Sequence, residues 1–180
     1  MKIDPIELIT KEKINLSKNL YLISGNEITL IRKIKDILTK YFITKNDGIV
    51  ENIDSLINYR ESGSLFHSAK ILIVKSYKDV DEDQINKLSD SNDVFIFCFE
   101  NTPGIRKLKG AFQKNNNCVL VDCYELTKAN KVQILNKILE KNDFKLEEEV
   151  FWFLIDKLDN RFGVCDQEIS KLLKTNKDNL

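Results

Sequence analysis

The residues best placed for phosphate chemistry follow the first apolar run of the chain. Residues 20–23 read as a strand, and Gly25, Asn26 and Glu27 come next, directly before a helical pattern. A phosphate loop in this setting needs several glycines whose N–H groups turn inward and a lysine that reaches the terminal phosphates. Here one glycine is present, no Gly-Lys-Ser/Thr follows, and the Glu27 carboxylate would repel phosphate. The sequence therefore predicts a degenerate loop at Gly25, Asn26 and Glu27 that binds no nucleotide.

Other catalytic arrangements are equally incomplete. The strand predicted at residues 71–74 ends in Lys75, where a hydrolase that binds Mg²⁺ would need an aspartate. His67 is the only histidine, and a lone histidine is far more often a surface or capping residue than a base. No serine or cysteine stands in a nucleophile elbow. We therefore expect no catalytic residue and a protein that is not an enzyme by itself.

Cysteine spacing, charge and hydropathy argue against several other functional classes. The four cysteines show no C-x-x-C spacing and no neighbouring histidine, so we expect no metal or cofactor and mostly buried, reduced thiols in a cytoplasmic protein. These residues are Cys98, Cys118, Cys123 and Cys165. Charged residues make up 31% of the chain and balance to zero, which leaves no nucleic-acid footprint at the level of the whole chain. Apolar runs are too short to span a bilayer, and no signal-peptide core begins the chain.

Strands and helices alternate through the first two thirds of the chain. Most of the predicted strands are apolar throughout, which is typical of a parallel sheet covered on both faces. We therefore expect an α/β fold with a largely parallel sheet. The expected strands are residues 19–24, a short strand that opens at 49–50, and residues 71–74, 94–99 and 118–121. The expected helices are a helix with its lead-in at 2–18, one at 28–42, one capped by Asp54, one around 85–88, and a basic helix capped by Thr102 and Pro103.

The pattern changes near Glu125, after which only helical periodicity remains. We predict two parts, residues 1–125 and 126–180, the second being a small helical domain. Its second helix should bury one apolar face, and its third helix should start at Asp166. That apolar face comprises Leu146, Val150, Phe153, Leu154 and Leu158.

Ser64, Leu65 and Phe66 form an unusual apolar tip just before the strand at residues 71–74. Neighbouring residues on a helix project about 100° apart, so Leu65 and Phe66 cannot both lie deep in one narrow core stripe. Gly63 weakens any helix that runs through this stretch. Two alternatives remain open from the residues alone: the pair plugs the top of the core, or it is exposed and binds a partner.

Three segments resemble, in order, the delta subunit of the bacterial DNA polymerase III clamp loader. Residues 20–27 are similar to the family's opening strand and the acidic remnant of its phosphate loop. Residues 64–66 with the strand that follows are similar to its Ser-Leu-Phe segment. Residues 160–163 with 168–172 are similar to the glycine turn and helix of its lid domain. Each segment is short, but together they span nearly the whole chain.

This resemblance implies an AAA+-like, P-loop-derived domain at residues 1–125 without a nucleotide site. Residues 126–180 would be an incomplete helical lid, and the family's collar domain would be absent. Family members bind no ATP, and their Leu-Phe pair enters a hydrophobic pocket on the ring-shaped sliding clamp and helps to hold it open. The resemblance thus implies that Leu65 and Phe66, supported by Ser64, bind the clamp during DNA replication.

The resemblance also implies partners. They are the sliding clamp, which is the beta subunit, and the gamma/tau and delta-prime loader subunits if a collar exists in the full protein. DNA contact would be weak or indirect, and no membrane is involved. The competing hypotheses are a divergent P-loop nucleotide-dependent enzyme and another clamp-loader-like AAA+ adaptor. The delta-prime type is disfavoured because its zinc-binding cysteines are missing.

Overall fold

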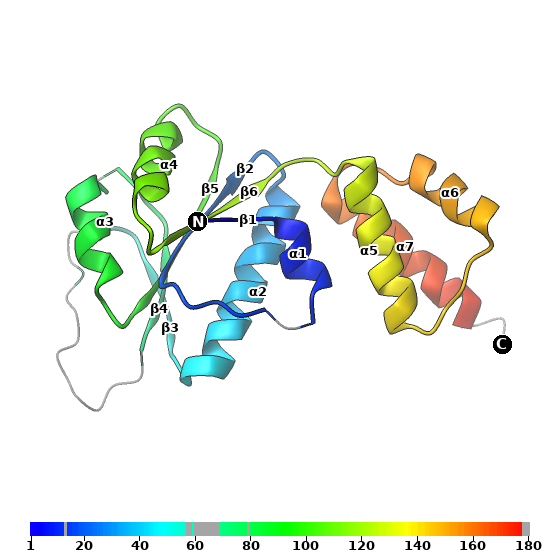
Figure 1. Ribbon diagram of the computed structural model, residues 1–180, viewed down its shortest axis with the longest axis horizontal. Helices are drawn as coiled ribbons and strands as arrows, with labels where there is room; N and C mark the ends of the chain where they lie inside the picture. Colours follow the sequence, from blue (N-terminus) through cyan, green and yellow to red (C-terminus); the bar gives the residue numbers. More distant parts are fainter. Residues whose placement is uncertain (13, 57–58, 60–68, 79, 178–180) are drawn as a thin grey trace.

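A computed structural model describes residues 1–12, 14–56, 59, 69–78 and 80–177 of the chain (Figure 1). Its centre is a six-stranded sheet with the order β1-β6-β2-β5-β4-β3, in which every neighbouring pair is parallel. The strands are β1 (Lys2–Ile3), β2 (Leu20–Gly25), β3 (Val50–Ile53), β4 (Ile71–Val74), β5 (Val94–Glu100) and β6 (Cys118–Cys123). The predicted α/β class with a parallel sheet is confirmed.

Burial on both faces explains why the strands are so apolar. All six residues of β2 are buried between β5 and β6. Tyr21 and Ile23 face a core that also contains Ile6 of α1 (Pro5–Thr10) and Ile34 of α2 (Ile28–Asn46). Leu20 and Leu22 face a second core on the other side of the sheet, with α3 (Glu82–Ser89) and α4 (Ile105–Lys114). Because side chains alternate along a strand, β2 serves both cores at once.

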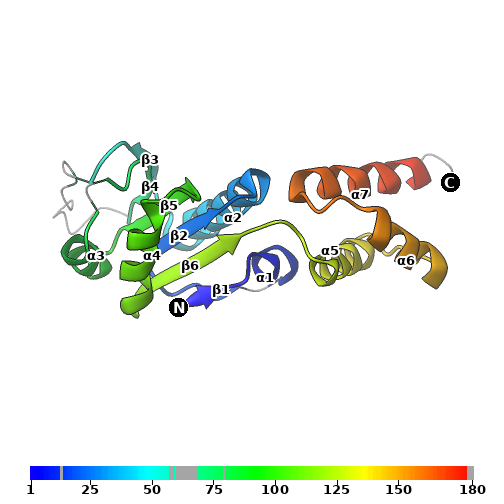
Figure 2. The same ribbon diagram turned by 90° about the horizontal axis from the view of Figure 1, so that it is seen from above.

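Three helices follow the sheet: α5 (Lys128–Lys141), α6 (Glu148–Lys157) and α7 (Phe162–Lys177). Strand β6 points toward them (Figure 2), and they make up one end of the molecule. Buried residues of all three helices belong to the same core cluster as Ile31 of α2, for example Ile134, Ile155 and Cys165. The helical part is thus packed against the sheet part, and the domain boundary near Glu125 stays a prediction.

Several predicted helix boundaries are wrong. The amino-terminal helix covers only the six residues Pro5–Thr10, with Pro5 in its first turn and Asp4 accepting the Ile6 N–H, and the short strand β1 precedes it. Asp54 caps no helix, since residues 54–56 and 59 are not helical. Helix α4 begins after Gly104 without a side-chain cap, because the Thr102 hydroxyl is bonded to the Tyr77 hydroxyl instead.

The helical part also departs from two predictions. Helix α7 begins at Phe162 rather than Asp166, because Asp159 turns the chain by accepting the Arg161 N–H at 2.7 Å. On α6, Val150 and Phe153 are 42% and 61% exposed although the sequence pattern placed them in the core. The buried side chain of α6 is Ile155, which points to the other side of the helix. No helix among the described residues is long and apolar enough to cross a membrane.

Candidate functional site

Ser64, Leu65 and Phe66 lie outside the described residues, so whether the pair is exposed stays a prediction. The residues that flank this segment are described. Before it, Leu56 is buried in the core shared by α3 and α4. After it, Lys70 leads into β4 and forms an ion pair with Glu51 of β3, with Nζ and Oε1 3.0 Å apart. Both flanks of the segment are therefore attached to the sheet part.

A single buried carboxylate, Asp93, joins the two flanks. The Tyr59 hydroxyl donates a hydrogen bond of 2.7 Å to Oδ2 of Asp93, and the Lys70 N–H donates one of 2.8 Å to Oδ1. Asp93 is 4% exposed, and its own N–H donates to the Ser91 hydroxyl at 3.1 Å. The Tyr59 ring also meets Phe95 edge-on, with ring centroids 5.0 Å apart. Asp93 thus fixes both ends of the segment that carries Leu65 and Phe66.

Sequence reasoning missed Asp93. Its one signal is its position as an acid directly before the most apolar strand of the chain, where a polar residue that becomes buried must find partners. Its partners Tyr59 and Lys70 lie 34 and 23 residues earlier in the chain, so a local sequence pattern could not reveal them.

The degenerate loop at Gly25, Asn26 and Glu27 is closed by the neighbouring strand. The N–H groups of Asn26 and Glu27 both donate to the carbonyl oxygen of Cys123, at 3.1 and 3.2 Å. The approach is so close that a Cβ on Gly25 would lie 1.6 Å from the same oxygen. The backbone donors that a phosphate loop would turn toward phosphate are engaged here with the end of β6.

Glu27 occupies the start of α2, where an anion would otherwise be favoured. Glu27 is only 6% exposed. Its Oε1 accepts hydrogen bonds from the Thr29 N–H, at 3.0 Å, and from the Thr29 hydroxyl. A carboxylate at a helix amino terminus satisfies free N–H groups and interacts favourably with the helix dipole. It also repels a second anion at the same place.

Thr29 in turn connects the loop to the helical part. Its Oγ1 accepts a hydrogen bond of 2.8 Å from the Gly163 N–H in the first turn of α7. A Cβ on Gly163 would lie 2.8 Å from Cγ2 of Thr29, so only glycine allows this approach without a shift. Glu27, Thr29 and Gly163 form a contact that we call the α2–α7 latch.

Lys75 stands at the carboxyl end of β4, as the sequence predicted. Its Nζ lies 3.3 Å from Oδ1 of Asp54, and the two side chains are 57% and 90% exposed. A pair this exposed contributes little to stability. The acid that a Mg²⁺ site would need at this strand end is thus replaced by a lysine whose charge is partly offset by Asp54.

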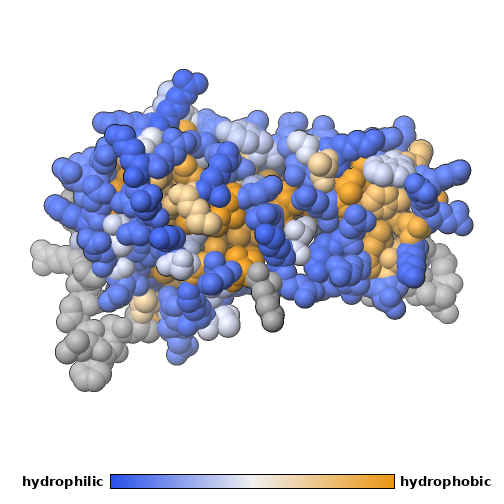
Figure 3. Space-filling model, in the orientation of Figure 1, coloured by the Kyte–Doolittle hydropathy of each residue, from blue (hydrophilic) through white to orange (hydrophobic). Residues whose placement is uncertain are grey.

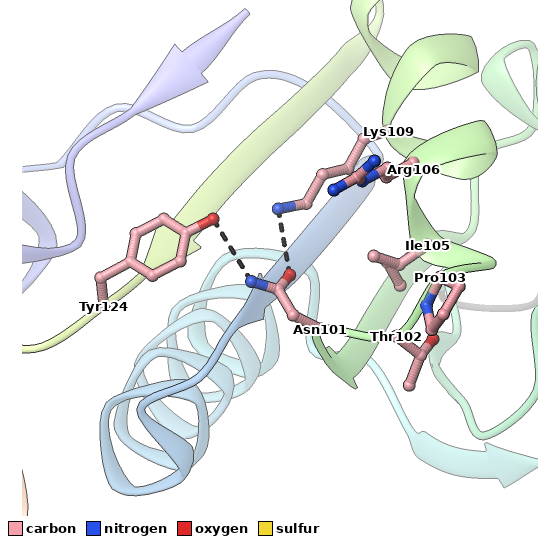
Figure 4. A pocket seen from close by; sticks show the side chains of 7 residues that line it. All are labelled: Asn101, Thr102, Pro103, Ile105, Arg106, Lys109 and Tyr124. Atoms are coloured by element: carbon pink, nitrogen blue, oxygen red, sulfur yellow. Dashed lines mark hydrogen bonds between the residues drawn. The ribbon is translucent and has the colours of Figure 1, made fainter.

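A polar cavity of about 580 Å³ lies beside the ends of β5 and β6 (Figure 4). At its wall, Lys109 donates to Asn101 Oδ1 at 3.4 Å and forms an ion pair of 2.8 Å with Asp122. Lys2 pairs with the same carboxylate at 2.9 Å. Burial raises the pKa of Asp122, but the hydrogen bonds and charges of Lys109 and Lys2 outweigh it and hold that pKa below its ordinary value.

The basic face of α4 is partly neutralised. Lys109 is paired with Asp122, and Lys114 lies 3.0 Å from Glu82 of α3. Arg106 and Lys107 are exposed. This arrangement is that of a solvated helix face, and the structure adds no feature that favours direct DNA contact there.

The cysteines and acids do not converge on a metal site in the part of the chain that the structure describes. Cys118, Cys123 and Cys165 are buried and Cys98 is half-buried, so the prediction of mostly buried thiols is confirmed. Burial raises the pKa of Cys118 and Cys123 to about 12. Such thiols stay protonated near neutral pH and are poor nucleophiles.

Comparison with solved structures finds similar folds in two replication proteins. No family model and no curated protein sequence matches the chain. Domain III of the replication initiation protein DnaA from Thermotoga maritima matches with a TM-score of 0.50 and 19% identity, over 90% of this chain and 78% of that one. The DNA clamp loader delta protein of Bacillus subtilis matches with a TM-score of 0.55 and 15% identity, over 89% of this chain and 54% of that one.

Identities this low show the fold alone. The six-stranded parallel sheet flanked by helices, with further helices after it, is common to this chain and both replication proteins. The chain spans about half the length of the clamp loader delta protein.

Proposed function

We propose that this chain acts as a clamp-loader delta protein, a non-catalytic AAA+-like adaptor that binds a sliding clamp during DNA replication. Leu65 and Phe66 are the proposed anchors, with Ser64 in support. The observation that carries the proposal is the double anchorage at Asp93, which holds both flanks of this segment at 2.7 and 2.8 Å in a fold similar to a clamp loader delta protein. An anchored segment loses less conformational freedom when its tip binds a partner.

The state of the phosphate loop supports a role without ATP hydrolysis. The loop donors of Asn26 and Glu27 are bonded to Cys123, and Glu27 caps α2. Nucleotide binding would have to break these bonds and place phosphate beside a carboxylate, which is costly. Calorimetric titration with ATP and Mg²⁺ tests this, and binding in the micromolar range would contradict it.

The proposed partners follow from the clamp-loader assignment. The sliding clamp is the direct partner, and the gamma/tau and delta-prime subunits are partners if the full protein carries a collar domain. DNA contact is proposed to be weak or indirect.

The decisive experiment is the double change Leu65→Ala with Phe66→Ala, with affinity for the organism's own sliding clamp measured by surface binding. Burying such side chains contributes about 1.5–3 kcal/mol each, so losing about 4 kcal/mol weakens binding roughly a thousandfold. The urea midpoint of unfolding should stay near that of the unchanged protein. Ile49→Ala is the matched control, because Ile49 is an apolar side chain that is 64% exposed on the same sheet part.

Two results would contradict the assignment. If the double variant folds normally and keeps its clamp affinity, Leu65 and Phe66 are not the anchors. If the urea midpoint collapses, the pair belongs to the chain's own core.

A second experiment tests the anchorage. Asp93→Ala removes the carboxylate that accepts from both the Tyr59 hydroxyl and the Lys70 N–H, so clamp affinity should fall about tenfold with Leu65 and Phe66 still present. Asp122→Ala removes a carboxylate of the same sheet that is bonded to Lys109 and Lys2 instead, and it should leave clamp affinity unchanged. Equal affinities for all three proteins would show that the anchorage does not matter for binding.

The second candidate function is a divergent P-loop nucleotide-dependent enzyme. Only the AAA+ fold favours it. The ATP titration separates the two, because this candidate requires nucleotide binding and the clamp-binding adaptor does not.

A further inference from the structure

Helix α6 is apolar on two opposite sides, although only one side packs on the chain's own core. Ile155 is fully buried, whereas Phe153 is 61% and Val150 is 42% exposed. Successive helical residues are about 100° apart, so Phe153 lies about 200° around the helix from Ile155. A surface helix of a globular protein normally has one apolar side, which is buried, and a polar side opposite to it. The outer side of α6 is therefore an apolar surface that the described part of the chain leaves exposed.

Exposed apolar residues are concentrated on this helix. Single exposed apolar side chains are ordinary on protein surfaces, but groups of them mark interaction sites. Val150, Trp152 and Phe153 all belong to the ten residues of α6. Figure 3 shows hydrophobic surface over the helical end of the molecule, where a hollow of about 460 Å³ lies between α5 and α6 beside Trp152.

The charges on the outer side of α6 are arranged symmetrically about Phe153. Glu149 lies four residues before it and Lys157 four residues after it, so the two are on the same side of the helix, each about 6 Å along the axis from Phe153. Neither Glu149 nor Lys157 forms an ion pair with another described residue, whereas the neighbouring Asp156 is paired with Lys128 at 2.7 Å. The Nζ of Lys157 lies 5.8 Å from the centroid of the Phe153 ring.

This order of acid, aromatic ring and base is complementary to itself. If a second copy of α6 is laid antiparallel on the first, with the two-fold axis beside Phe153, the two Phe153 rings meet at the centre. Glu149 of each copy then comes to the height of Lys157 of the other copy, and the Lys157 stem covers Val150. A two-fold interface requires such a self-complementary surface. We propose that the outer side of α6 binds a second copy of this chain and forms a two-fold dimer.

The size of the face determines how strong this dimer can be. Ten helical residues extend only about 15 Å, well below what the standard interfaces of stable complexes need. We therefore expect a reversible dimer with a dissociation constant on the order of 10–100 µM. Sedimentation equilibrium of the 180-residue chain between about 1 µM and 1 mM should show the weight-average mass rising from one copy toward two.

Charge reversal gives the sharpest test. Glu149→Lys alone places like charges together twice in the dimer and should weaken it about tenfold, and Lys157→Glu alone should do the same. Glu149→Lys with Lys157→Glu restores opposite charges across the two-fold axis and should recover the original dissociation constant within about threefold. Only a face that pairs with itself in the antiparallel sense predicts this rescue.

A second variant, with a matched control, tests the apolar centre of the proposed dimer interface. Phe153→Ala should weaken the dimer by more than about tenfold, because two rings lose their burial. Ile43→Ala removes a side chain that is 41% exposed near the end of α2 and should leave the dissociation constant unchanged. Circular dichroism and urea unfolding establish that each variant is folded.

Three results would overturn the proposal. The first is a chain that stays monomeric up to about 1 mM, which would leave the outer side of α6 to a different partner. The second is a dimer that Phe153→Ala does not weaken. The third is a double charge variant no better than its single parents, which would exclude antiparallel pairing through Glu149 and Lys157. None of these results bears on clamp binding through Leu65 and Phe66.

Discussion

Strand β2 and helix α6 are both strongly apolar, yet they bury their residues very differently. Every residue of β2 is buried, because β5 and β6 flank it and helices cover both faces of the sheet. On α6, Ile155 is buried while Phe153 on the other side is 61% exposed. The same apolar composition thus has two meanings: in a central parallel strand it reflects two cores, and in a peripheral helix it reflects one core and one open face.

The contrast shows where the packing of this molecule can tolerate change. At the carboxyl end of β2, backbone atoms of neighbouring strands are in direct contact, and any added atom must displace them. On the outer side of α6, large side chains can be removed without leaving a cavity. The predictions below test this contrast, beginning with the largest expected effect.

The end of β2 should be the least tolerant position. Gly25→Ala places a Cβ 1.6 Å from the Cys123 carbonyl oxygen, so β2 and β6 must separate, at a cost on the order of 3–5 kcal/mol of unfolding free energy. Gly110→Ala is the control, because nothing lies within 4 Å of its Cβ position and alanine is the better helix former by about 1 kcal/mol. Urea unfolding measures both, and an equal midpoint for the two variants would refute the close approach.

The two sides of α6 should respond differently to the same kind of truncation. Ile155→Ala leaves a cavity in the shared core and should cost about 2–5 kcal/mol of unfolding free energy. Phe153→Ala removes an exposed ring and should change it by no more than about 0.5 kcal/mol, measured at a concentration where the chain is monomeric. A large loss in the Phe153 variant would mean that this side of α6 is packed after all.

The carboxylate at the edge of the polar cavity should make stability depend on pH. Asp122 has a pKa below its ordinary value of 3.8, so its contribution is fully present above about pH 4 and is lost as pH falls through the lower folded pKa. Asp122→Asn should cost about 1–2 kcal/mol of unfolding free energy at pH 6. That difference from the unchanged protein should shrink below pH 4, as followed by urea unfolding at several pH values. A difference that is constant down to pH 2 would exclude the pairing with Lys109 and Lys2 as its cause.

Breaking the α2–α7 latch should cost less stability than removing the Asp122 carboxylate. Thr29→Val removes the acceptor of the Gly163 N–H and the donor to Glu27, which should cost about 1 kcal/mol of unfolding free energy. Thr44→Val is the control, since the Thr44 hydroxyl donates only to the Lys40 carbonyl of its own helix. Limited proteolysis should cut the Thr29 variant faster between residues 122 and 129, while β5 stays protected. Early cleavage within β5 would contradict its place at the centre of the sheet.

Much of the sheet could be predicted because its strands are buried on both faces. Residues 71–74 form β4 as expected, and the runs at 19–24, 94–99 and 118–121 differ from β2, β5 and β6 by one or two residues. Helix ends were harder, because caps compete: Thr102 was expected to cap α4, but its hydroxyl bonds Tyr77. Strand β1 has only two residues and depends on pairing with β6, so its sequence carries no period that could reveal it.

The sequence by itself determined that the loop after β2 lacks the glycines and the lysine of a phosphate site, because these are requirements on residue type at short spacing. Only the tertiary structure decided what takes their place. The Cys123 carbonyl closes the loop from a distance of about one hundred residues, and Asp93 joins Tyr59 to Lys70. Likewise, the pattern of α6 shows apolar residues on two opposite sides, but only packing selects the side that Ile155 faces. Local pattern determines which residues must leave water, whereas the partners they find depend on how distant elements meet.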